Sequence, residues 1–300
     1  MPSKKQWKGK TRGGNFGYWF FIALLKNFGL GFAYFFLRFV VIYFVLFAPK
    51  ASRAQYYYLH DVQHFNFWKS IAGLVRNYYV FGQVILDKVA LMSGVKTDFT
   101  YDFDGENYLH QLAEQGEGAI LVGAHFGNWE IAGQLLQRIN VKVHILMLDA
   151  EHEKIKAMLN KTMSHRSLNI IPIKSDMSHL LLIKKAFDNK EFVAMHGDRF
   201  LGNAKHFSCN FFDRKADFPT GPFYMAMKFG VPITFVSALK ESDKHYHFFA
   251  TEPKEYKNFG KPKQRDAQIK IIMQAYISNL KELMKAYPYQ WFNYYRFWKS

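Results

Sequence analysis

The segment GAHFGNWE, residues 123–130, contains a histidine and a glutamate whose spacing suits proton-transfer chemistry. His125 and Glu130 lie five positions apart, which is about 500° of ideal helix, so their side chains cannot share one helix face. Gly127 and Asn128 supply a break between them, and Asn128 is a good N-cap for the helix that follows. Glu130 then lies in the first helical turn, where the helix dipole favours a carboxylate. The spacing predicts a general base and its orienting carboxylate.

The position of this pair favours chemistry. The apolar run at residues 118–122 predicts a buried strand directly before His125. Open α/β sheets bind their ligands beyond the carboxyl ends of parallel strands. The alternative is a plain hydrogen-bonded His–Glu pair at the surface or in the core, which is the more common arrangement for two such residues taken alone.

A second polar cluster, MHGDRF, follows the strand predicted at residues 192–196. Because parallel strands end at one edge of a sheet, Asp198 and Arg199 could face the same crevice as His125. Arg199 could then hold a phosphate or carboxylate in a two-pronged hydrogen bond. A plain surface ion pair between Asp198 and Arg199 is the alternative.

A third cluster, FFDRKADFPTGP at residues 211–222, is predicted to be a turn-rich loop that opens a helix. Thr220 and Gly221 near that helix start would turn backbone N–H groups toward an anion. An ordinary connection between a strand and a helix explains the same residues equally well.

These segments resemble the lysophospholipid acyltransferase-like superfamily, and within it the lipid A biosynthesis acyltransferases of the lauroyl and myristoyl transferase type. The resemblance covers about residues 97–298 and consists of segments in the family's order. They are GAHFGNWE with the family's H-x-x-x-x-D/E pattern, HRSLNIIPI with a basic residue at Arg166, GDRF, FFDRKADFPTGP followed by GVPITFVSA, and the ending YPYQWFNYYRFW. Arg199 stands where the family usually has glutamine.

The resemblance implies a transfer of a fatty acyl chain from an acyl carrier protein to a hydroxyl group of a lipid. His125 would take the proton of the acceptor hydroxyl as its oxygen attacks the thioester, and Glu130 would orient the histidine. No cofactor, metal or covalent acyl-enzyme is expected. The residues assigned to substrate binding are Arg166, Asp198, Arg199, Asn128, Thr220 and Gly221. A lipid A precursor is the expected acceptor, and an aryl-polyene pigment or an amino-acid-containing lipid is the alternative.

The elements that must position these residues alternate from residue 97 onward, which predicts an α/β fold with a mainly parallel central sheet flanked by helices. Strands are predicted at residues 99–103, 118–122, 141–148, 168–173, 192–196, 232–239 and 246–251. Helices are predicted at residues 106–114, 129–138, 151–164, 178–188, 223–229 and 264–287. We expect a basic N-terminal arm at residues 1–14, membrane-associated helices at 15–95 and a catalytic domain at 96–300.

The N-terminal part is suited to an anionic membrane surface. Residues 1–60 hold nine Lys or Arg and no acidic residue, within a chain of net charge +16. The apolar stretch at residues 15–49 is interrupted by Lys26 and Arg38, and an arginine at the bilayer centre costs about 2.5–3.5 kcal/mol. We therefore expect a hairpin or in-plane arrangement on the cytoplasmic face of the inner membrane, rather than one span.

Composition limits the other classes of function. The single cysteine, Cys209, excludes an internal disulfide or a cysteine-based zinc site. The sequence has no helix-turn-helix, zinc-finger or ribonucleoprotein signature, so no nucleic-acid partner is expected. Two other classes stay open: a metal-dependent hydrolase, which twelve histidines allow, and a non-catalytic membrane-binding protein, which leaves His125 unexplained.

Overall fold

The computed structural model describes residues 14–129, 131, 136–148, 169–174, 176–200, 202, 204–256 and 260–299. The predicted helix at residues 151–164, half of the helix at 129–138 and all but the last residue of the basic arm lie outside this set. Its α-helices are α1 (Gly14–Phe47), α2 (Pro49–Tyr57), α3 (Phe67–Met92), α4 (Glu106–Glu114), α7 (His179–Asp188), α8 (Gly221–Phe229) and α9 (Pro262–Ala286). Short helical turns occur at η1 (Tyr58–Val62), η2 (Leu136–Ile139) and η3 (Pro288–Gln290).

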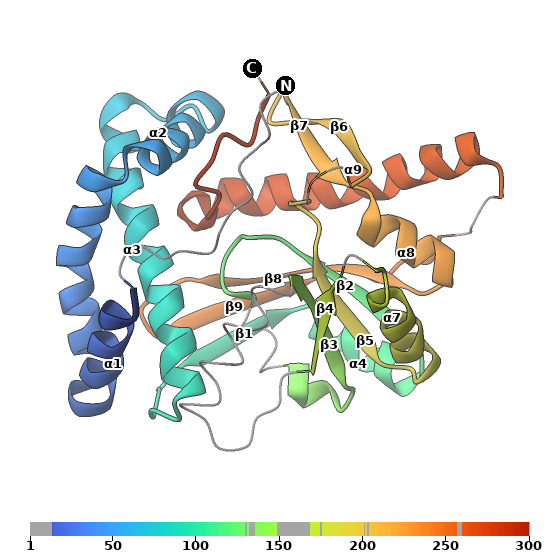
Figure 1. Cartoon of the computed structure of the whole chain (residues 1–300), viewed down its shortest axis with the longest axis horizontal. Helices are drawn as coiled ribbons and strands as arrows, with labels where there is room; N and C mark the ends of the chain where they lie inside the picture. The colour runs from blue at the N-terminus through green and yellow to red at the C-terminus, as the bar shows by residue number, and fades with distance from the viewer. Residues whose placement is uncertain are drawn as a thin grey trace.

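A seven-stranded sheet forms the centre of the protein, in the order β1-β9-β8-β2-β5-β3-β4. Its strands are β1 (Thr100–Asp104), β2 (Ala119–Gly123), β3 (Val143–Leu148), β4 (Asn169–Ile173), β5 (Phe192–His196), β8 (Ile233–Lys240) and β9 (His245–Ala250). Neighbouring strands are parallel except β8 and β9, which are antiparallel. The prediction of a mainly parallel sheet flanked by helices is confirmed (Figure 1).

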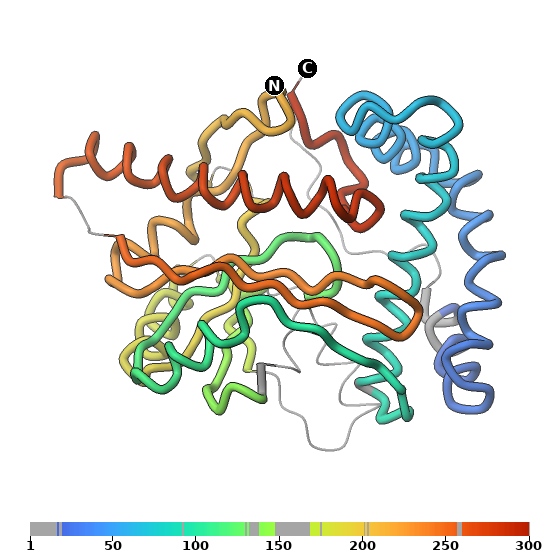
Figure 2. The backbone as a smooth tube through the Cα atoms, turned by 180° about the vertical axis from the view of Figure 1, so that it is seen from behind, coloured from blue at the N-terminus to red at the C-terminus, as the bar shows by residue number. Residues whose placement is uncertain are grey.

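Strand β2 lies at the centre of the sheet and is buried on both faces, as its continuous apolar run predicts. Ile120 and Val122 belong to the same buried cluster as Ile272 and Met273 of α9. Ala119 and Leu121 point the other way, into a cluster that contains Leu109 and Leu112 of α4. Helices α9 and α4 therefore cover opposite faces of the sheet, as both views show (Figures 1 and 2).

Residues 206–219 form a hairpin, and its second strand lies within residues 211–222, which are predicted from the sequence to be a turn-rich loop. Strands β6 (His206–Phe211) and β7 (Arg214–Pro219) pair antiparallel in a separate two-stranded sheet. The turn between them consists of Phe212 and Asp213, both with positive φ, at 52° and 58°. Two-residue hairpins of this kind usually carry Asn-Gly or Asp-Gly. The prediction of a loop is wrong because Phe-Asp gives no such signal.

Helix α1 bends back on itself at Gly29, whose backbone is not helical (φ 79°, ψ 179°). The rings of Phe20 and Phe36 lie 5.9 Å apart. In a continuous helix the sixteen positions between them would span roughly 24 Å. By length and composition alone, Phe20–Phe47 would suffice to cross a membrane. The chain path is instead a helical hairpin, one of the two arrangements expected for residues 15–49.

Helices α1 to α3 stand beside the sheet (Figures 1 and 2). The inner side of α1 packs on α3, and Leu37 would collide with any side chain at Gly82, whose Cβ would lie 2.4 Å from Leu37 Cδ1. Leu25 and Leu59 from this helical part belong to the same buried cluster as Ile120 of β2. One continuous core thus joins the N-terminal helices to the sheet.

Candidate active site

The pairing of β2 with β5 brings the two predicted polar clusters together. The strands are parallel, with Gly123 opposite His196, and the N–H of Gly197 donates to the carbonyl of Gly123 at 2.9 Å. The residues that follow each strand therefore leave the sheet at the same edge. This register places His125, two residues beyond β2, next to Asp198, two residues beyond β5.

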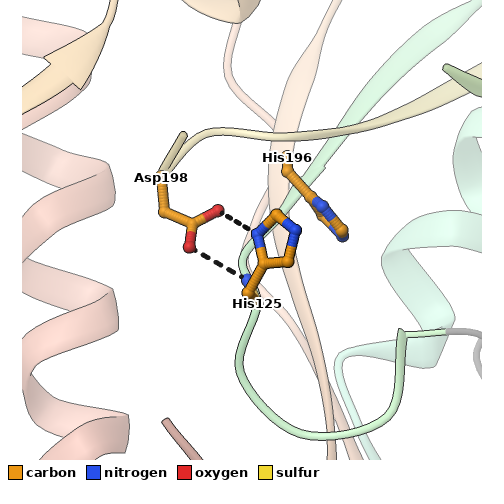
Figure 3. Close-up of side chains that lie close together, drawn as sticks. All are labelled: His125, His196 and Asp198. Carbon is orange, nitrogen blue, oxygen red and sulfur yellow. Dashed lines mark hydrogen bonds and ion pairs between the residues drawn. The ribbon is translucent and has the colours of Figure 1, made fainter. Parts of the chain in front are cut away.

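His125 and Asp198 are joined by two hydrogen bonds (Figure 3). His125 Nδ1 lies 2.9 Å from Asp198 Oδ1, and the backbone N–H of His125 donates to Oδ2 at 3.1 Å. An ionised carboxylate only accepts, so Nδ1 carries the proton and Nε2 is left with its lone pair. The side chain of Asp198 is fully buried, whereas that of His125 is 24% exposed. The arrangement leaves a basic nitrogen reachable from outside, with its partner carboxylate hidden behind it.

Asp198 stays ionised although it is buried. Burial by itself would raise the pKa of its carboxyl group, but the charge and hydrogen bond of His125 and the charge of Arg199 hold that pKa well below its usual range. The amide of Asn293 also donates to Oδ2, at 3.3 Å. A buried carboxylate in this state can orient the imidazole and stabilise an imidazolium.

His196, the last residue of β5, is a second imidazole in the site. Its ring centre lies 4.2 Å from that of His125 and 4.9 Å from the ring of Trp129. Burial, together with the nearby charge of His125, lowers the pKa of His196 to about 3. His196 therefore stays neutral and does not compete with His125 for a proton. The sequence predicts no role for His196, and the one signal for it is its place at a strand end directly before Gly-Asp.

Three side chains of the site offer atoms that could ligate a metal. One such atom each of His125, His196 and Asp198 lies within 4.8 Å of the other two. Both oxygens of Asp198 already accept hydrogen bonds from His125. A metal ion would have to replace those bonds, so the residues fit a base with its orienting carboxylate better than a metal centre.

The loop that carries His125 is fixed by the backbone of neighbouring elements. The carbonyl of His125 accepts from Phe292 N at 3.0 Å, and Gly127 N donates to the carbonyl of Gln290 at 3.0 Å. Gly127 has a φ of +70°, and a Cβ there would lie 2.2 Å from the carbonyl oxygen of Ala238. Only glycine combines this conformation with so close an approach of two backbones.

Asn128 caps the following helix, as predicted. Its Oδ1 accepts from the backbone N–H of Ile131 at 3.3 Å, and its Nδ2 donates to the hydroxyl of Tyr246 at 3.1 Å. The residue is fully buried. The assignment of Asn128 to substrate binding does not fit this position, because both ends of its amide are used inside the protein.

Arg199 binds the C-terminal segment of the chain. Its Nε donates to Asn293 Oδ1 at 2.6 Å and its Nη2 to the carbonyl of Phe292 at 3.0 Å. The side of the guanidinium formed by Nε and Nη2 is thus bound to protein atoms. Asp198 likewise contacts His125 instead of facing a substrate, so its predicted role shifts from binding to positioning.

Thr220 and Gly221 lie at the start of α8, as expected. Thr220 is buried, and its hydroxyl donates to the carbonyl of Lys205 at 3.0 Å. Its backbone N–H donates to the same oxygen, also at 3.0 Å. Both donors of Thr220 are thus used within the protein, by the residue before β6, and are not open to an anion. Glu130 and Arg166 lie outside the described residues, and their roles stay predictions.

Comparison with known proteins gives a family. Residues 74–300 match the family described as bacterial lipid A biosynthesis acyltransferase. Among solved structures, the chain is similar to the 1-acyl-sn-glycerophosphate (LPA) acyltransferase PlsC from Thermotoga maritima, with 14% sequence identity and a TM-score of 0.37. That similarity covers 83% of this chain and 97% of the other. No curated protein matches the chain. The family match includes both His125 and Asp198.

Asp198→Asn tests the carboxylate behind the histidine. We expect kcat to fall by about 10²–10⁴-fold, because an amide neither fixes the tautomer nor stabilises the imidazolium. Initial rates and thermal unfolding should be measured together. Asp217→Asn is the control, since Asp217 is also ion-paired, with Lys299 at 2.7 Å, and should leave kcat unchanged.

The pH profile of the wild-type protein supplies a second readout for the same assignment. The pKa of His196 is about 3 and that of Asp198 lies below its usual range, so neither group changes charge above pH ~5. Because these two groups take up no proton in that range, a fall of the rate toward acid above pH ~5 should have a slope no greater than one. A limb that requires two protons would contradict the assignment.

Gly127→Ala tests the close approach of the loop to β8. We expect a loss of stability of several kcal/mol and a large loss of activity, because the new Cβ meets the Ala238 carbonyl at 2.2 Å in a backbone with positive φ. Gly116→Ala is the matched control, since Gly116 also has a positive φ, +65°, but no atom within 4 Å of its Cβ. Thermal unfolding of both variants separates the collision from the backbone strain. Equal losses would show that the approach to Ala238 is unimportant.

Proposed function

The chain belongs to the bacterial lipid A biosynthesis acyltransferase family, and we propose that it transfers a fatty acyl chain from an acyl-carrier-protein thioester to a hydroxyl group of a lipid acceptor. The family gives acyl transfer as the reaction class. The observation that carries the mechanism is the bond between His125 Nδ1 and the buried carboxylate of Asp198, at 2.9 Å. It leaves Nε2 as the basic atom of a partly exposed imidazole.

In the proposed reaction His125 Nε2 accepts the proton of the acceptor hydroxyl while the oxygen attacks the thioester carbonyl. A carbon–oxygen bond forms, and the carbon–sulfur bond then breaks. The imidazolium returns its proton to the leaving thiolate, which restores the neutral histidine. Asp198 stabilises the imidazolium between these steps because its charge lies 2.9 Å from Nδ1. No covalent acyl-enzyme is needed, which agrees with direct transfer by a base.

We retain Glu130 as the second member of the H-x-x-x-x-E pattern. The family resemblance supports a role for it in orienting His125, beside the role that the hydrogen bonds give to Asp198. Arg166 is retained as a substrate-binding candidate. Arg199 is assigned instead to holding the C-terminal segment against the site, because its Nε and Nη2 donate to Asn293 and Phe292.

The acceptor is a lipid, and the apolar hairpin supplies a surface that could meet it. The outer side of α1 exposes a row of large apolar side chains, Phe35, Phe39, Ile42 and Leu46, which are 48–65% exposed. At the start of α3, Phe67 and Trp68 are exposed by 52% and 77%. Exposed apolar patches of this kind mark membrane contacts. We place the protein on the cytoplasmic face of the inner membrane, where acyl carrier protein is available.

Two alternatives to this proposal differ from it in the acceptor and in the reaction class. A relative acting on an aryl-polyene pigment or an amino-acid-containing lipid would use the same base, and only the acceptor would differ. A metal-dependent hydrolase is favoured by the three ligating atoms of His125, His196 and Asp198. Turnover that is unchanged after exhaustive chelation would support metal-free acyl transfer, whereas loss of turnover that zinc restores would support the hydrolase.

His125→Ala tests the proposed base. We expect the variant to fold and to lose about 10²–10⁴-fold in rate, the usual contribution of a general base. The assay should follow acyl transfer from acyl carrier protein to extracted bacterial lipid by mass spectrometry. Acyl coenzyme A serves as a second donor.

His179→Ala is the control for that experiment, because His179 lies at the start of α7, where its Nδ1 accepts from the backbone N–H of Lys174. It should keep the wild-type rate. A folded His125→Ala protein with near-wild-type turnover would contradict the role of His125 as the base. Equal rates with both donors would contradict a specific requirement for acyl carrier protein.

Leu46→Asp, combined with Phe39→Asp, tests the membrane surface. Both side chains lie on the outer side of α1, 65% and 59% exposed, and a charge there opposes insertion into lipid. We expect the variant to shift from the vesicle fraction to the soluble fraction on flotation. Leu181→Asp is the matched control, since Leu181 is 73% exposed on α7 and should leave binding unchanged. Full retention of the α1 variant on vesicles would contradict the proposed surface.

A further inference from the structure

A buried ion pair lies between the N-terminal helices and the sheet. Lys240 Nζ at the end of β8 is 2.7 Å from Asp87 Oδ2 on α3, and their side chains are 2% and 0% exposed. Two phenol hydroxyls, from Tyr34 of α1 and Tyr246 of β9, also donate to the carboxylate of Asp87. Burial raises the pKa of Asp87, and Lys240 together with the two phenols opposes that rise.

The ion pair is not explained by stability alone. Taking two charges out of water costs several kcal/mol per ion, and apolar residues of the same volume often serve as well. A buried ion pair whose hydrogen-bond partners are fixed has one geometry. It can therefore hold the side chains that bind it in defined positions. Here Asp87 is bound by residues of three other elements: α1, β8 and β9.

One of those partners leads directly to the active-site loop. The hydroxyl of Tyr246 donates to Asp87 and accepts from Asn128 Nδ2 at 3.1 Å. Asn128 in turn caps the helix that follows His125, through Ile131 N at 3.3 Å. Its backbone N–H also donates to the Ala238 carbonyl, at 2.7 Å. A chain of buried hydrogen bonds therefore runs from α3 through β9 to the loop that carries the base.

We propose that Tyr246, held by Asp87, is a positioning residue for catalysis that acts through Asn128 on the His125 loop. The direction of donation explains the geometry. The phenol of Tyr246 donates its one O–H hydrogen bond to Asp87, so it can only accept from Asn128. The amide must therefore present its NH₂ to Tyr246 and keep its oxygen for the helix cap. The carboxylate of Asp87 thus fixes which way the Asn128 amide points. This inference rests on the proposed role of His125.

Tyr246→Phe removes the hydroxyl and leaves the ring in place. We expect kcat to fall by about 10- to 100-fold, the cost of a small misplacement of a catalytic group, with KM for both substrates within about threefold. Tyr34→Phe is the matched control, because it also removes one phenol bond to Asp87 but makes no bond to Asn128. It should lower Tm to a similar extent and keep kcat within about threefold. His125→Ala assayed beside them reports the proposed base separately.

Asn128→Ser provides a second route in case Tyr246→Phe does not fold. Serine keeps a good helix cap but loses the amide that reaches Tyr246. We expect Asn128→Ser to lower kcat to the same extent as Tyr246→Phe. The double variant should be no slower than the slower single variant, because both substitutions remove the same hydrogen bond. Equal falls in kcat for the Tyr34 and Tyr246 variants would reduce the network to a structural role. Additive effects in the double variant, or an unchanged kcat, would overturn the proposal.

Discussion

The charge of Asp198 is the constraint on which the site depends. A carboxylate with no exposed surface is stable only when donors surround it. His125 gives two of them, and Asn293 gives a third. These donors come from the β2 and C-terminal parts of the chain, so the charge can be buried only when β2 and β5 are paired in the observed register and the last segment is in place. The imidazole of His125 is oriented because its Nδ1–H is one of the donors that the buried carboxylate needs.

The sequence predicts the sheet well because its signals are local. The apolar run of β2 and the end of β5 are each visible in a few residues, and the rule that ligands bind at strand ends brings His125 and the MHGDRF cluster to one edge. The partner choice within that edge is not local. Asp198 touches His125 because strands far apart in sequence pair with Gly123 opposite His196. No spacing in the chain specifies that register, so the sequence predicts substrate binding for Asp198. It predicts the same for Asn128, whose side chain is buried and bonded to Tyr246.

The N-terminal helical part shows a different limit of sequence reasoning. Arg38 makes a single span costly and favours a hairpin or in-plane arrangement, but the position of the bend depends on one backbone conformation, at Gly29. Glycine reaches a positive φ without strain, yet a glycine within an apolar stretch does not by itself predict a reversal. The rings of Phe20 and Phe36 meet across the bend of α1. This is a tertiary contact that pattern and composition cannot supply.

The C-terminal segment links the two buried carboxylates. Gln290 holds the end of β8 through both ends of its amide: it accepts from Lys240 N and donates to Lys240 O, at 2.9 and 2.8 Å. Its own carbonyl accepts from Gly127 in the active-site loop, and Asn293 three residues later binds Asp198. The same short stretch therefore touches the residue that pairs with Asp87 and the residue that orients the base. The loop that carries His125 therefore keeps its geometry without regular secondary structure. Polar contacts tie it to elements whose positions the hydrophobic core already fixes.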